Sequence, residues 1–345
     1  MMRIKFYGVR GSIPATSYKN NARIDIAKGV DHSVLRAHTE QFGHSFSIEE
    51  FGGNTTCIGV LNSENQMHII DTGSGARNLN RDLIGMRKEN KIHPRTYVLY
   101  THMHHDHTMG MPFLSELNYT NFYETYICSM SPEILFEGTK SEIARSSQFL
   151  KHLSDFENGV AQRVIPTNQE QLKFPVPASP RFQYKPIQNT SKEILSQYQK
   201  NTRIEIHPKP ISHANLDKSD ITLSYKIIDM ETKKTVTILT DFEPTFTDKD
   251  KEIIDWIKGS DMVYLDGQYE LGSTENQFVK GWGHCCALYA TELACKANID
   301  RILIGHHSPN HDDRYLKGLE QRVIQQAQKG GKLAKLVREN EVYLI

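Results

Sequence analysis

The chain has 345 residues, which is enough to bury a full hydrophobic core and long for one domain, so one large domain with insertions is expected. Lysine plus arginine and aspartate plus glutamate each number 41. This balance gives no electrostatic argument for binding a long nucleic acid or a membrane. The five cysteines are odd in number and lack C-x-x-C spacing, and no apolar leader or membrane-spanning run is evident, so a soluble, cytoplasmic protein is expected.

The N-terminal region begins with an alternating pattern at Arg3–Gly8 that predicts a strand. The turn that follows, Gly8–Ser12, contains glycines that permit close approach of another group, so it either contacts an anion or simply ends the strand. Residues 17–50 are polar and indicate an insertion, with a helix near Ile24–Gln41.

Two strands are expected after this insertion, at Cys57–Leu61 and Met67–Ile70, followed by a helix that covers the sheet around Leu79–Met86. The second of these strands runs into Asp71. A carboxylate at that position either orients a metal ligand from behind or caps the turn.

The most informative stretch is His102–His107, which holds four histidines and one aspartate. It lies on a loop, because a buried strand is expected before it at Thr96–Thr101 and a helix after it at Met111–Leu117. Side chains alternate along an extended backbone, so His102 and His104 point the same way, as two ligands of one ion must.

The other two residues of this loop with ligand chemistry, Asp106 and His107, then point elsewhere. They can serve a second ion at about 3.5 to 4 Å from the first, the usual separation in two-metal sites. A solvated, histidine-rich loop is the alternative, but four of the 16 histidines within six positions favour a metal site.

Residues 119–200 carry little regular apolar alternation and indicate a second insertion. A helix is expected near Pro132–Leu153, followed by a proline-rich connector at Phe174–Pro180. Segments of this kind form a cap or an oligomer contact, so a homodimer is one expectation.

The second half of the chain contains further apolar runs that predict strands, at Ile204–Pro210, Thr222–Ile228, Thr235–Thr240, Met262–Leu265 and Arg301–Gly305. Four of them lead to a carboxylate or an imidazole, at His213, Asp241, Asp266 and His306. With Asp71 there are five such ends, so these groups are expected to gather along one rim of a pair of sheets.

The order of D-T-G, T-H-M-H-H-D-H, a later histidine, T-D and a late G-H-H resembles the metallo-β-lactamase-fold hydrolases, over nearly the whole chain outside the two insertions. The resemblance implies an α/β fold, an αββα sandwich formed by one domain of residues 1–345 with insertions at about 17–50 and 119–200. It also implies two metal sites. The first would be held by His102, His104 and His213, the second by Asp106, His107 and His306, and Asp241 would bridge them. His207 and His307 are close enough in sequence to be alternatives to His213 and His306, and His105 fills a variable position.

Finer features resemble the phosphodiesterase branch of that family, which includes cyclic-phosphate and cyclic-nucleotide phosphodiesterases and, more distantly, tRNase Z. They are the opening F-Y-G-V-R-G-S-I-P, the G-G-N-T-T-C segment, G-W-G-H and H-H-S-P-N-H-D-D. The resemblance implies that His284 protonates the leaving oxygen and that Asp266 orients it, so the expected catalytic residues are His284, Asp266 and Asp106. Cys285 and Cys286 replace the serine and threonine of the family motif.

The expected function is hydrolysis of a small, cyclic nucleotide or phosphate ester by a metal-activated hydroxide. Seven nitrogen and oxygen ligands suit two divalent ions, Zn²⁺ first, with Mn²⁺ or Fe as alternatives. A tRNA 3′-processing endonuclease would need a basic arm, and none is evident. A thioester hydrolase would leave G-W-G-H unexplained, a flavodiiron oxidoreductase usually has Glu where this chain has His104, and a non-catalytic scaffold would not need the full ligand set.

Overall fold

The computed structural model describes residues 1–15, 51–102, 104–120, 122, 124–129, 182–186, 204–213, 221–270 and 281–345. The first predicted insertion, 17–50, and the helices predicted near Ile24–Gln41 and Pro132–Leu153 lie outside the described residues. Within the described part of the chain, no helix has both the length and the apolar character needed to cross a bilayer.

The first sheet has seven strands in the order β13-β1-β2-β3-β4-β5-β6. Their bounds are β1 Arg3–Gly8, β2 Cys57–Leu61, β3 Met67–Ile70, β4 Arg95–Leu99, β5 Glu124–Ser129, β6 Phe182–Pro186 and β13 Val342–Leu344. The pairs from β13 to β3 are antiparallel, and those from β3 to β6 are parallel. The carboxyl ends of β3 and β4 therefore lie at the same edge of this sheet.

The second sheet has six strands in the order β12-β11-β10-β9-β8-β7. Their bounds are β7 Ile204–Ser212, β8 Ile221–Asp229, β9 Thr235–Leu239, β10 Met262–Asp266, β11 Arg301–Gly305 and β12 Leu333–Leu336. The strands β9 to β12 pair in parallel, whereas β7, β8 and β9 are antiparallel neighbours. The carboxyl ends of β9, β10 and β11 consequently share one edge.

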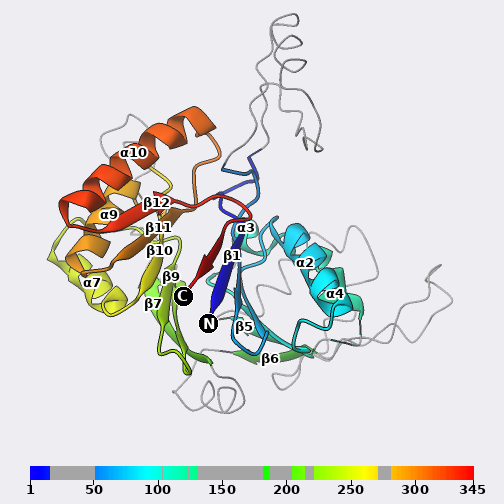
Figure 1. The fold of residues 1–345 in the computed structure, drawn as a ribbon. Coiled ribbons are helices and arrows are strands. Elements are labelled where there is room, and N and C mark those ends of the chain that lie inside the picture. The colour runs from blue at the N-terminus through cyan, green and yellow to red at the C-terminus, as the bar shows by residue number, and fades with distance from the viewer. Residues whose placement is uncertain are drawn as a thin grey trace, which may run out of the picture.

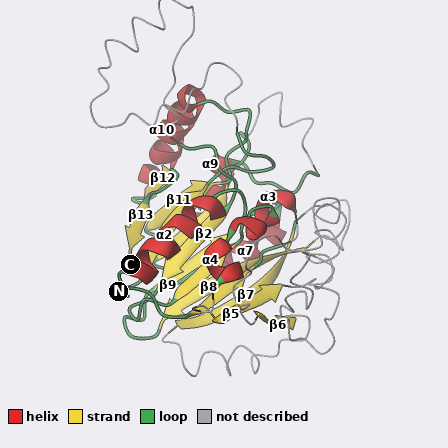
Figure 2. Ribbon diagram, turned by 90° about the vertical axis from the view of Figure 1, so that its right-hand side faces the viewer, coloured by secondary structure: helices red, strands yellow, loops and turns green. Residues whose placement is uncertain are grey.

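Three apolar clusters define four layers. One contains residues of both sheets, including Phe6 and Tyr264, and lies between them. The outer face of the first sheet packs on α2 (Ala76–Lys88) and α4 (Ser115–Tyr119). The outer face of the second sheet packs on α7 (Lys251–Ile257), α9 (Ala287–Lys296) and α10 (Asp313–Lys329). The helices thus flank a pair of sheets on both sides, and the predicted αββα sandwich is confirmed (Figures 1 and 2).

The strand predictions agree with the structure to within one or two residues, and the predicted helix at Leu79–Met86 lies inside α2. The helix predicted at Met111–Leu117 is wrong as a single element. It is divided into a 3₁₀ turn, η1, at Met111–Phe113 and the short α4. The loop predicted at His102–His107 contains one helical turn, α3, at His105–Thr108.

The second predicted insertion, about 119–200, is too wide as predicted. Its described residues include β5 and β6, which pair in register with β4 and with each other and so belong to the first sheet. Their side chains alternate too weakly between apolar and polar for the sequence to reveal them as strands. The assignment of the whole chain to one domain stays a prediction.

His68 in β3 provides a test of the core between the sheets. Its side chain is buried and stacks on Tyr97 with ring centroids 5.0 Å apart, and burial lowers its pKa from 6.5 to about 4. Between pH 4 and pH 6.5, His68 is therefore protonated in the unfolded chain and neutral in the folded chain. We expect the free energy of unfolding to fall by about 3 kcal/mol from this group as the pH drops from 6.5 to 4, and to be unaffected by it above 6.5.

The measurement is urea unfolding of the wild type and of His68→Leu from pH 7 to pH 4. The variant should lose the part of the pH dependence that His68 contributes. His93→Leu, which alters an exposed histidine, is the control and should keep the wild-type slope. Equal slopes in wild type and His68→Leu would show that His68 is not held neutral by the core.

Candidate metal centre

The ends of strands from both sheets bring their polar side chains to one place. Asp71 follows β3, Asp241 lies two residues beyond β9, Asp266 ends β10 and His306 follows β11. The His102–His107 loop follows β4 at the same edge as Asp71. The structure brings these groups together because parallel strands present their carboxyl ends at a common edge.

Three of these strand-end residues leave their strands with a left-handed backbone. The φ angles are 56° at Asp71, 52° at Asp241 and 58° at His306. Aspartate and histidine are among the residues that tolerate this region best, but each conformation still carries strain. Strained residues that cluster around one group of ligands are typical of a functional site.

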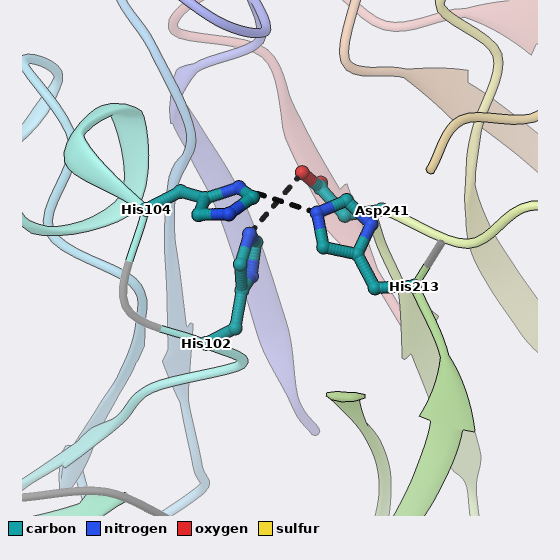
Figure 3. A group of neighbouring side chains, drawn as sticks. All are labelled: His102, His104, His213 and Asp241. Atoms are coloured by element: carbon teal, nitrogen blue, oxygen red, sulfur yellow. Dashed lines mark hydrogen bonds and ion pairs between the residues drawn. The ribbon is translucent and has the colours of Figure 1, made fainter. Parts of the chain in front are cut away.

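The first cluster consists of His102, His104, His213 and Asp241 (Figure 3). His213 Nε2 lies 3.2 Å from His104 Nδ1, and His102 Nε2 lies 3.5 Å from Asp241 Oδ2. The rings of His102 and His104 reach the same space from different directions, with centroids 4.4 Å apart and an angle of 72° between their planes (Figure 3). The four side chains converge from β4's loop, the end of β7 and the end of β9.

The second cluster consists of Asp106, His107, His306 and again Asp241. His306 Nε2 lies 3.2 Å from both His107 Nε2 and Asp106 Oδ2, and 3.1 Å from Asp241 Oδ1. Because the two clusters share Asp241, one carboxylate lies between two groups of three further ligand side chains.

The donor spacing fits a metal ion. In a tetrahedral zinc site with bonds of about 2.0 to 2.1 Å, ligand atoms lie about 3.3 Å apart, close to the separations of 3.1 to 3.5 Å in both clusters. His102 Nε2 and Asp241 Oδ2 are buried and have no hydrogen-bond partner among the described residues. Buried polar atoms of this kind need a partner, and a cation between them would supply it.

The protonation states of His102, Asp106 and Asp241 also suit metal binding. Burial, together with the neighbouring histidines, lowers the pKa of His102 well below its ordinary value, so its ring is neutral and keeps a free lone pair. Burial alone would raise the pKa of Asp106 and of Asp241, but His107 and His306 lower both far below the usual range. The carboxylates are therefore charged at neutral pH.

In His107 and His213, the ring nitrogen that faces away from the clusters has a partner that fixes the ring orientation. His107 Nδ1 lies 2.7 Å from Asp71 Oδ2, and Asp71 also accepts hydrogen bonds of 2.8 Å from the amide and hydroxyl of Thr101. His213 Nδ1 lies 3.0 Å from the carbonyl of Gly283. Of the two alternatives for Asp71, the structure shows contact with His107 of the second cluster, and a carboxylate at Nδ1 favours the tautomer that turns Nε2 toward the cluster.

We expect Asp71→Asn to weaken Zn²⁺ binding by about 10- to 100-fold, because the amide cannot hold the His107 ring as a carboxylate does. Chelator competition with purified protein measures this. Asp82→Asn is the matched control, since Asp82 on α2 pairs with Lys5 and belongs to neither cluster. Unchanged affinity in Asp71→Asn would assign Asp71 to the turn alone.

His284 lies beside both clusters. Its Nδ1 is 2.9 Å from Asp266 Oδ2 and 4.0 Å from Asp241 Oδ2, and its ring stacks on His306 with centroids 4.9 Å apart. Burial alone would lower the pKa of His284, but Asp266 and Asp241 raise it. The Cys285 thiol donates to the carbonyl of Cys286 and not to His284, so the support of the His284 ring that the structure shows comes from Asp266.

The histidines that the sequence left open as alternative ligands lie outside both clusters. His207 Nε2 pairs with Glu205 at 2.9 Å within β7, and His307 Nε2 faces the carbonyl of Val337 at 2.9 Å. His105 is exposed. The clusters therefore contain His213 and His306 rather than these neighbours.

The glycine turn after β1 reaches the site, although the sequence left its role open. The amide of Ser12 donates a 2.8 Å hydrogen bond to Asp106 Oδ2. A Cβ at Gly11 would lie 2.4 Å from His306 Cε1, so the close approach requires glycine. Arg10 is buried and donates to the carbonyls of Gly52, Ser308 and His311, which makes it structural.

The sequence analysis missed Glu243 and Gln268. Glu243 is buried beyond β9 and accepts hydrogen bonds from two amides of the G-W-G-H segment, and the Gln268 side chain donates to the Ser12 hydroxyl. A signal for Glu243 existed, since it lies two residues after Asp241. Nothing in the local pattern distinguishes Gln268.

Fold and site together define the class as a metal-dependent hydrolase of the metallo-β-lactamase fold. The model of the beta-lactamase superfamily domain matches residues 68–307, and the chain belongs to this family. No curated protein sequence matches the chain.

Solved structures show the same fold. A diphosphatase of the PhnP family has a TM-score of 0.58 at 12% identity, with 100% of this chain and 98% of the other covered. The short form of human tRNase Z has a TM-score of 0.52 at 12% identity, with 99% of each chain covered. Zn²⁺-bound PqqB from Methylobacterium extorquens has a TM-score of 0.55 at 12% identity, with 99% and 100% covered.

Proposed function

We propose that the protein is a phosphodiesterase with two metal ions that hydrolyses a small, cyclic nucleotide or a related phosphate ester. The observation that carries the proposal is the pair of clusters that share Asp241, with the His284–Asp266 pair beside them. The similarity to structures named as a diphosphatase and a tRNase Z supports phosphate ester chemistry. A homodimer and a cytoplasmic location stay predictions.

The residues fit two ions. The first would be held by His102, His104 and His213, the second by Asp106, His107 and His306, with Asp241 between them. Nitrogen and oxygen ligands without cysteine suit Zn²⁺, as in Zn²⁺-bound PqqB, with Mn²⁺ or Fe as alternatives. When bound, such ions activate water and neutralise charge on the phosphoryl oxygens.

The remaining step, protonation of the leaving oxygen, requires a side chain of the protein. The oxygen that leaves phosphorus needs a proton, and His284 can hold one because Asp266 and Asp241 favour its charged form. Asp266 accepts from Nδ1, which leaves Nε2 as the nitrogen available to a substrate. The amide of Ser12 keeps the Asp106 carboxylate in place.

Trp282 favours a nucleotide over a simple phosphate ester. Its side chain is 61% exposed, although it lies one residue from Gly283, which contacts His213, and two from His284. An exposed indole beside a reaction centre offers a flat surface on which a base can stack, at about 1 to 3 kcal/mol per base.

The decisive experiment joins metal analysis of the purified protein to hydrolysis assays on 3′,5′-cyclic, 2′,3′-cyclic and linear phosphodiesters. We expect about two divalent ions per chain and turnover of a cyclic substrate. Cleavage of a tRNA precursor without turnover of cyclic nucleotides would favour the nuclease alternative, and turnover of a thioester would favour a thioester hydrolase. Two bound ions without turnover of any phosphodiester would refute the proposal.

Trp282→Ala tests the stacking surface. For a nucleotide substrate we expect KM to rise by about 5- to 100-fold with kcat nearly unchanged, because stacking contributes equally to ground state and transition state. A phosphodiester with only methyl groups should show no difference between wild type and variant. An equal loss on both substrates would place Trp282 in the structure of the loop instead.

A further inference from the structure

We infer that Glu243 is a positioning residue that sets, through one backbone turn, both His213 of the first cluster and the adjacent His284. The inference concerns the turn Gly281–Gly283, and its catalytic meaning rests on the proposed function. No motif in the sequence assigns a role to Glu243.

Glu243 holds the turn with both carboxylate oxygens. The amide of Gly281 donates to Oε1 at 2.8 Å, and the amide of Gly283 donates to Oε2 at 3.2 Å. The side chain is buried, with the residue 9% exposed, so these bonds are largely shielded from water. Glu243 lies two residues from Asp241, so the same segment beyond β9 carries the shared carboxylate and the anchor of the turn.

The opposite side of the turn touches His213. The carbonyl of Gly283 is the partner of His213 Nδ1 at 3.0 Å, and a Cβ at Gly283 would lie 2.1 Å from the same nitrogen. Gly283 has a φ of 88° and Gly281 a φ of 90°, which side chains other than glycine rarely adopt. A displacement of the turn would therefore rotate the His213 ring.

The turn also fixes where the next residue begins. His284 follows Gly283 directly and places its ring against Asp266 and His306. Glu243 thus positions both His213 of the first cluster and His284, the candidate proton donor. Asp71 supports His107 in the second cluster by direct contact, whereas Glu243 acts through backbone amides.

The test compares Glu243→Ala and Glu243→Gln with the wild type. Alanine removes both acceptors, while the glutamine amide keeps one oxygen, so we expect effects in the order Ala, Gln, wild type. Glu252→Gln on α7 is the matched control, because Glu252 is an exposed partner of Lys209. Amide hydrogen exchange at Gly281 and Gly283 should accelerate at least about tenfold in Glu243→Ala and not in the control.

A second measurement determines the affinity of each site for Zn²⁺. In Glu243→Ala we expect the first site to lose about 10- to 100-fold in affinity and the second site to lose less, because the turn is bonded directly to His213 of the first cluster and reaches His306 of the second only through His284. A third uses fluorescence anisotropy of Trp282 in a Trp256→Phe background, since the chain has two tryptophans. The anisotropy should fall in Glu243→Ala as the turn gains motion.

The outcomes separate this inference from the proposed function. If the wild type binds metal but cleaves no phosphodiester, the proposed function fails, and the exchange and anisotropy results still decide the role of Glu243. A folded Glu243→Ala protein with unchanged exchange, anisotropy and Zn²⁺ affinity overturns the inference. If alanine prevents folding, the same three readouts in Glu243→Gln decide it.

Discussion

Replacing Asp241 by alanine is expected to weaken binding of both metal ions and to lower kcat/KM at least about a thousandfold. Asp241 is the one side chain common to both clusters, with Oδ2 3.5 Å from His102 Nε2 and Oδ1 3.1 Å from His306 Nε2. Without it, the four buried imidazoles of the two clusters lose the carboxylate that lies between them. Groups that act as one unit lose activity far out of proportion to a single contact.

The measurements are metal content after dialysis and kcat/KM on the substrate found in the hydrolysis assays. Asp241→Asn should fall between wild type and alanine, because it keeps one oxygen donor but not the charge. His105→Ala is the matched control, since His105 lies in the same loop but is exposed and outside both clusters. Retention of two ions by Asp241→Ala would contradict a shared ligand.

Replacing His284 by alanine is expected to lower kcat by about 10²- to 10⁴-fold while metal content stays unchanged. The effect should depend on the leaving group. A nucleoside alkoxide needs a proton as its bond to phosphorus breaks, whereas nitrophenolate leaves without one. The loss should therefore be large for a nucleotide and small for a nitrophenyl phosphodiester.

Asp266→Asn should reproduce part of this pattern, because Asp266 holds Nδ1 of His284 at 2.9 Å and favours the protonated ring. The pH dependence of kcat/KM in this variant should shift as His284 loses its charged partner. Equal losses on both kinds of leaving group in His284→Ala would show that the ring orders the site rather than donates a proton.

Much of the fold could be predicted from local pattern. The runs at Cys57–Leu61, Met67–Ile70 and Arg301–Gly305 are strands with the predicted bounds, because strands buried on both faces appear as continuous apolar segments. The helix over Met111–Leu117 failed, since the backbone leaves the helical region at Leu114, where φ is −78° and ψ is 63°, between the 3₁₀ turn and α4. β5 and β6 were missed because their sequences alternate too weakly between apolar and polar residues, and only their pairing with β4 and with each other shows them to be strands.

The sequence by itself determined the chemistry of the site: the spacing of His102, His104, Asp106 and His107 on one loop, and strands that run into Asp241 or His306. Only the tertiary structure decided which groups meet. In the folded chain His213 lies in the first cluster, whereas His207 pairs with Glu205. Asp71 contacts His107, and Glu243 accepts a hydrogen bond from the G-W-G-H turn. The reason is that side-chain periodicity is a local property, whereas a shared edge exists only after strands distant in sequence have paired in parallel.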